Sequence, residues 1–92
     1  MKNDPIALQA DPADPEDFDV SAEDLDRGLK ARAVRQARTA LDLSQAEFAR
    51  RFRVPVGTLR DWEQARTSPP DFALAYVRVI ERHPDMVLAA IA

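Results

Sequence analysis

The sequence contains no cysteine and a single histidine. The lack of cysteine excludes a disulfide framework and a thiolate metal site, and it fits a reducing compartment. With His83 as the only imidazole, a zinc site would depend almost entirely on carboxylates, which zinc rarely accepts. We therefore expect no bound metal and no cofactor.

Glycine is also scarce, and the two glycines, Gly28 and Gly57, lie too far apart to build a phosphate-binding loop. Ser44 and Ser68 both stand where a helix cap is expected, which leaves no serine beside a base that could make it a nucleophile. These shortages remove the common catalytic constellations. We expect a binding protein without enzymatic activity and without a small-molecule ligand.

No apolar run approaches the roughly 18 residues that span a bilayer. The first residues, MKNDPIALQADPADP, lack both the basic region and the apolar stretch of a secretory signal. The sequence alone therefore predicts a cytoplasmic protein without a membrane partner.

The net charge of −3 conceals two segments of opposite sign. Residues 1–26 carry nine acidic residues and one lysine, a net charge of −8. Residues 27–92 carry twelve basic and seven acidic residues, a net charge of +5. Such asymmetry suggests two tasks, with a basic body that meets phosphate and an acidic arm that meets another partner.

The acidic arm, which we assign to residues 1–24, contains three prolines among acidic and small residues. Such a segment cannot bury enough apolar surface to offset its ordering entropy, so we expect it to be disordered or to fold only on a partner. Its sparse apolar residues are the candidate anchors: Ile6, Leu8, Phe18 and Val20. A plain solubilising tail is the alternative interpretation.

Helix signals dominate the rest of the chain, and no alternation typical of β-strands appears. The S-x-x-D/E signature of a helix N-terminus begins at Ser21, Ser44 and Ser68. Gly28 weakens the first of these helices, so we expect its firm part to begin near Leu29.

Two prolines mark later helix entries, because proline has no N–H to donate and is tolerated at a helix start but not inside the helix. We expect one helix from Pro55 or Val56 to Gln64 and a last short helix from Pro84. Between them, apolar residues recur on one helix face: Phe72, Ala75, Tyr76, Val79 and Ile80. Residues 25–92 are therefore predicted to be one all-α domain of five helices.

The segment LSQAEFARRFRVPVGTLRDWEQ has the form of a helix-turn-helix, in which two short helices bury their inner faces and the second remains free to enter the major groove. Ala49 is small enough to let the two helices approach closely. The residues expected to face inward are Phe48, Ala49, Phe52, Leu59 and Trp62.

LSQAEFARRF and VGTLRDWEQ resemble the Cro/phage-repressor class of helix-turn-helix proteins, often called Xre-like, over residues 29–80. Within that class, TLRDWEQARTSP followed by FALAYVRVIERHPDMVLAAI is similar to HigA-type antitoxins. The resemblance implies a five-helix lambda-repressor-like bundle that binds double-stranded operator DNA.

The resemblance also implies which residues meet DNA. Gln45 matches a position that contacts a phosphate and often a base edge, and Arg60 could reach a guanine or a phosphate. Val56 could pack on a thymine methyl group. The full set of DNA-binding positions is Gln45, Arg53, Val56, Gly57, Thr58, Arg60 and Asp61.

Two positions depart from the family pattern. Arg53 stands where the turn usually has glycine, and a non-glycine residue at positive φ costs energy, although the arginine could gain a phosphate contact. Gly57 stands where relatives carry a long polar side chain, so we expect more reading of DNA shape. Arg38 and Glu63 match a family pair that forms an internal salt bridge, for which a structural role outweighs a DNA role.

For partners, the antitoxin resemblance implies a RelE-like or HigB-like ribonuclease toxin, which we expect the acidic arm to bind and block. The arm could instead fold back over the basic helices and tune DNA affinity. A stand-alone Xre-like repressor without a toxin is the competing function, and a purely structural adaptor is the weakest reading.

The apolar C-terminal face exceeds what so small a core needs, so we expect part of it to form a homodimer interface. Complete burial within one chain is nearly as well supported. The candidate interface residues are Tyr76, Val79, Ile80, Met86, Val87 and Ile91.

Overall fold

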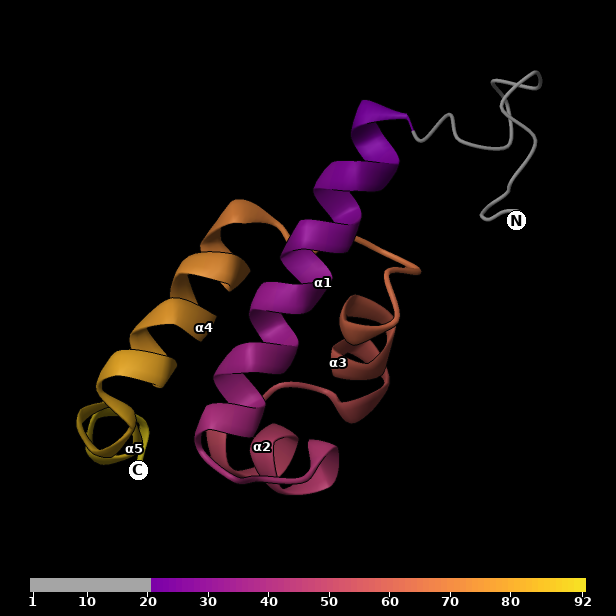
Figure 1. The fold of residues 1–92 in the computed structure, drawn as a ribbon. Helices are drawn as coiled ribbons and strands as arrows, with labels where there is room; N and C mark the ends of the chain where they lie inside the picture. Colours follow the sequence, from indigo (N-terminus) through magenta and orange to yellow (C-terminus); the bar gives the residue numbers. More distant parts are fainter. Residues whose placement is uncertain (1–20) are drawn as a thin grey trace, which may run out of the picture.

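The computed structural model describes residues 21–92, which form five α-helices and, within that range, no strand (Figure 1). The expected all-α class and the number of helices are confirmed. The four apolar anchors of the arm and the arm itself up to residue 20 lie outside the described residues. The helices are α1 (Ala22–Ala40), α2 (Gln45–Phe52), α3 (Val56–Glu63), α4 (Asp71–Arg82) and α5 (Pro84–Ile91).

The first helix begins at Ala22, so the expectation of a firm start near Leu29 is wrong. The Ser21 hydroxyl accepts a hydrogen bond from the backbone N–H of Asp24 at 3.0 Å, which caps the helix. A lysine–aspartate pair one turn apart, Lys30 to Asp26 at 3.0 Å, adds support to the first turns. These local contacts offset the cost of Gly28 in the helix.

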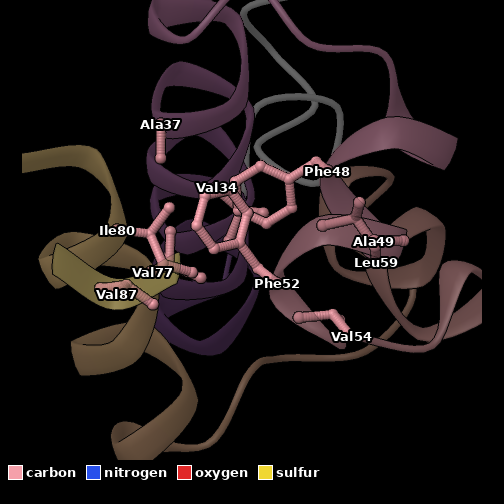
Figure 2. Packing of buried hydrophobic residues seen from close by; sticks show 10 residues of the cluster. All are labelled: Val34, Ala37, Phe48, Ala49, Phe52, Val54, Leu59, Val77, Ile80 and Val87. Atoms are coloured by element: carbon pink, nitrogen blue, oxygen red, sulfur yellow. The ribbon is translucent and has the colours of Figure 1, made fainter. Parts of the chain in front are cut away.

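The hydrophobic core lies where α1 crosses the other helices (Figure 2). Helix α1 packs against both α3 and α4, and α2 packs against α3 and α5. The rings of Phe48 and Phe52 have centroids 5.0 Å apart at a tilt of 46°, a favourable aromatic geometry. The buried cluster comprises Val34, Ala37, Phe48, Ala49, Phe52, Val54, Leu59, Val77, Ile80 and Val87.

The three serine signatures have three different outcomes. Ser44 forms a complete capping box, since its hydroxyl accepts from Glu47 N at 3.1 Å and the Glu47 carboxylate accepts from Ser44 N at 3.0 Å. Ser21 supplies the serine half of a box. The prediction that Ser68 caps α4 is wrong: the N-cap is Pro70, and no side chain caps that helix.

The two prolines that follow Ser68 explain why this serine does not cap α4. Pro69 is buried, and Pro70 is extended with φ −65° and ψ 163°. The Pro70 carbonyl accepts the first backbone hydrogen bonds of α4, from Ala73 N and Leu74 N. The helix therefore starts two residues later than a serine cap at residue 68 requires.

Helix α4 buries a different face from the one that its apolar pattern favours. Ala73, Val77 and Ile80 are buried, whereas Phe72 is 79% exposed and Val79 is 48% exposed. Both sets follow helical spacing, so periodicity alone does not choose between them. Of the residues assigned to one face, Ile80 belongs to the core and Phe72 and Val79 to the surface.

The C-terminal apolar residues divide in the same way. Ile80 and Val87 are core residues, Tyr76 and Ile91 are half-buried, and Met86 is 70% exposed.

No helix within residues 21–92 is both long enough and apolar enough to cross a membrane.

Candidate nucleic-acid interface

The turn between α2 and α3 is tight and left-handed. Arg53 adopts φ 61° and ψ 41°, the conformation for which glycine is favoured. The N–H of Val54 donates to the Ala49 carbonyl at 3.0 Å, which closes the end of α2. The exposed Arg53 side chain therefore lies at the corner between the two helices of the motif.

Helix α3 presents an open N-terminus to solvent. Its N-cap is Pro55, and no side chain caps its first N–H groups. Such N–H groups, together with the helix dipole, favour a phosphate oxygen. The half-buried Thr58 hydroxyl lies in the same first turn.

Two exposed positions follow on α3. A Cβ atom added at Gly57 would meet no heavy atom within 4 Å, so the surface there is open. Arg60 is exposed and has no ion-pair partner among residues 21–92. Val56 is half-buried and packs on the core. The outer face of α3 thus combines a free guanidinium with room for a nucleic-acid backbone to approach.

A buried ion pair ties α1 to the end of α3. Arg38 donates from Nε to Oε2 of Glu63 at 2.7 Å and from Nη2 to Oε1 at 2.9 Å. The Glu63 side chain is only 3% exposed. Hydrogen bonding to Glu63 raises the pKa of Arg38 despite the opposing effect of burial, so the guanidinium stays charged. The pair that the resemblance implies is therefore present, in a two-pronged geometry that fixes direction.

Two further side chains join this pair, and sequence reasoning missed both links. Arg35 donates through Nη1 to the Glu63 backbone carbonyl, across 28 residues of sequence. Gln45 donates through Nε2 to Glu63 Oε1 at 3.1 Å, across 18 residues. Gln45 is half-buried, and its amide keeps one N–H for a phosphate or a base edge. The network therefore sets the orientation of a residue expected to contact DNA.

The acidic residue of the expected DNA surface is neutralised by a neighbour. Asp61 is half-buried, and its Oδ1 lies 3.4 Å from Nη1 of Arg66, an exposed residue that we did not anticipate. Arg66 also donates its backbone N–H to the Asp61 carbonyl at 2.9 Å. This pairing reduces the repulsion that a carboxylate would exert on phosphate. The only sequence signal for it is the spacing of five residues.

The expected DNA-binding residues therefore all lie on α2, α3 and the turn between them. A family model described as Helix-turn-helix matches residues 34–85, more than half of the chain. No curated protein and no solved structure matches the chain. The chain belongs to the helix-turn-helix family of the Cro/repressor class and is a DNA-binding transcriptional regulator.

Proposed function

We propose that the protein is a HigA-type antitoxin that binds operator DNA as a dimer, represses its own operon and neutralises a RelE-like or HigB-like ribonuclease toxin. The observation that carries the proposal is the separation of charge: α2 and α3 form an open, basic edge, and the acidic arm has the opposite sign. A negative total charge does not oppose DNA binding, because counterion release depends on the charges that face the phosphates.

In the proposed complex, α3 enters the major groove. Arg60 reaches a guanine edge or a phosphate, and Gln45 uses its remaining amide N–H. Arg53 and the first N–H groups of α3 bind the DNA backbone. Gly57 offers no side chain to read a base, so DNA shape supplies part of the specificity.

Few base-reading side chains per protomer favour binding as a dimer over two half-sites about one helical turn apart. We assign the dimer contact to Val79 and Met86, the two candidate interface residues whose side chains are exposed on α4 and α5. Ile80 and Val87 are omitted, because they are fully engaged in the core. A strict monomer at tens of micromolar in sedimentation equilibrium would remove the dimer from the proposal.

The toxin contact is assigned to the arm, whose residues 1–20 carry six acidic residues and one lysine. A small ribonuclease toxin needs a basic surface for RNA, and an acidic segment that folds on this surface would block it. Ile6, Leu8, Phe18 and Val20 supply the apolar anchors.

The test uses the full chain and the small basic protein encoded beside it. Isothermal titration is run with the wild type and with a variant carrying serine at all four anchors. We expect the variant to lose toxin affinity and to bind operator DNA at least as tightly as the wild type, because its body and net charge are unchanged. Equal toxin affinity of the two proteins would assign the contact to the body, and the absence of any such partner would leave a stand-alone repressor.

A further inference from the structure

A groove lies beside the DNA-binding edge, between α3 and the start of α4. Its volume is about 550 Å³. Most of the side chains around it are apolar or aromatic, and one end carries the charged corner residue of the turn. The lining residues are Arg53, Val54, Pro55, Thr58, Trp62, Phe72, Ala73 and Tyr76.

One wall of the groove is held in place from the core side. The Tyr76 hydroxyl donates to the Phe52 carbonyl at 2.8 Å, which ties α4 to the end of α2. Burial raises the pKa of Tyr76, while the positive charge of Arg53 acts in the opposite direction. Tyr76 therefore stays neutral, and the cation of Arg53 lies close enough to influence it.

Two features of the groove have no partner among residues 21–92. Phe72, on its rim, is 79% exposed, an unusual position for a large aromatic ring that could otherwise be buried. Arg53 forms no ion pair with any described carboxylate. An occupant that satisfies both must carry apolar side chains and a nearby negative charge.

We propose that this groove binds residues 4–11 of the same chain, DPIALQAD, and that the bound arm competes with DNA. Ile6 and Leu8 occupy the apolar groove between Trp62 and Phe72. Asp4 or Asp11, which flank them, pairs with Arg53. The arm thereby covers a residue that otherwise contacts the phosphate backbone.

The length of the chain selects these residues over the other apolar pair of the arm. The first turns of α1 extend beyond the rest of the bundle, and the first buried residue, Ala31, lies about 15 Å along the helix from Ser21 (Figure 1). An extended chain spans about 3.3–3.6 Å per residue, so Phe18 reaches at most about 11 Å from Ser21, whereas Leu8 reaches about 43 Å. Only the distal pair can pass the protruding helix.

The docked arm lowers operator affinity, because only the molecules whose groove is free of the arm are competent to bind DNA. If about 90% of the molecules hold the arm in the groove, apparent DNA affinity is reduced about tenfold. A toxin that takes the arm would then strengthen repression. That consequence rests on the proposed function, whereas docking itself requires neither toxin nor DNA.

Trp62, the only tryptophan of the chain, lines the groove and reports its occupancy. Acrylamide quenching and the emission maximum are measured on three full-length proteins without DNA: wild type, Ile6→Ser/Leu8→Ser and Phe18→Ser/Val20→Ser. Both variants keep the charge of the arm. We expect the first to show stronger quenching and a red-shifted emission, and the second to match the wild type.

Three results would overturn docking: unchanged quenching in Ile6→Ser/Leu8→Ser, an equal change in both variants, or a shielding of Trp62 that grows with protein concentration, which would identify a second copy as the occupant. Operator affinity is then measured on the same proteins. A rise of about tenfold in Ile6→Ser/Leu8→Ser alone supports the competition. If none of the three proteins binds operator DNA, the proposed function fails while the Trp62 result stands.

Discussion

The two halves of the bundle are built by different means. In the half that contains α2 and α3, a capping box, a left-handed turn and the Arg38–Glu63 network fix the backbone and the side chains. In the half that contains α4 and α5, neither helix has a side-chain cap. The hydroxyl of Tyr76 makes the side-chain hydrogen bond that joins α4 to α2.

This difference corresponds to what each half must do. Hydrophobic burial is non-directional, so it holds α4 and α5 against α1 without specifying the orientation of a polar group. Hydrogen bonds are directional, and a surface that must match DNA needs its side chains placed to within about 0.5 Å. The polar contacts are concentrated where orientation matters.

The largest effect is expected from breaking the buried network. Arg38→Ala leaves the Glu63 carboxylate buried without its charge partner, which costs about 3 kcal/mol of the free energy of unfolding. The matching change in the other half, Tyr76→Phe, removes one neutral hydrogen bond and costs about 1 kcal/mol. Urea unfolding followed by circular dichroism measures both, and equal losses would contradict the contrast between the halves.

A smaller effect is expected at the helix caps. Ser44→Ala removes the hydroxyl that accepts from Glu47 N and leaves the backbone bond from Ser44 N to the Glu47 carboxylate, and it costs about 1 kcal/mol. Ser68→Ala is the matched control, because Ser68 is exposed and caps no helix, and its effect stays within about 0.5 kcal/mol. Thermal unfolding of the two variants measures both costs. A cost at Ser68 as large as that at Ser44 would show that Ser68 does cap α4.

A substitution in the left-handed turn is expected to raise the free energy of unfolding, whereas the preceding substitutions lower it. Arg53→Gly relieves a non-glycine residue at φ 61° and is expected to raise the free energy of unfolding by up to about 1 kcal/mol. The same variant loses operator affinity if the guanidinium binds phosphate. A destabilised Arg53→Gly would show that the arginine side chain supports the fold.

The smallest effect is a pH dependence of the α2 cap. Hydrogen bonds from the backbone and hydroxyl of Ser44 lower the pKa of Glu47. A lowered pKa means that Glu47 stabilises the fold above its unfolded-state pKa and that this contribution disappears as the pH falls through the folded-state value. Glu47→Gln should therefore lose less stability than the wild type on acidification from pH 7 to pH 3, measured by urea unfolding. Parallel curves would contradict the assignment.

Local signals predicted most of the fold. Ser44 with Glu47 marks one helix start and the prolines at 55 and 84 mark two others, because each acts within one turn of the chain. Which face of α4 is buried could not be predicted in the same way. Phe72 with Val79 and Ala73 with Ile80 have the same spacing, and only packing on α1 distinguishes the two faces.

The candidate site was predictable where a motif carries it. The helix-turn-helix segment places Arg60 and Gln45 on the correct helices, and the family resemblance supplies Arg38 with Glu63. The links from Arg35 and Gln45 to Glu63 span 28 and 18 residues, and no local pattern encodes them. Such contacts depend on how α1 and α2 meet the end of α3.

The proposed function depends above all on the binding of operator DNA by the exposed edge of α2 and α3. Fluorescence anisotropy with the duplex upstream of the protein's own reading frame, at low and moderate salt, tests it for wild type, Arg60→Ala and Arg32→Ala. Arg32 is an exposed arginine of α1, so both variants lose one positive charge. We expect Arg60→Ala to lose at least about tenfold in DNA affinity and Arg32→Ala to change it little. Equal losses in the two variants, or no binding by the wild type at low ionic strength, would contradict it.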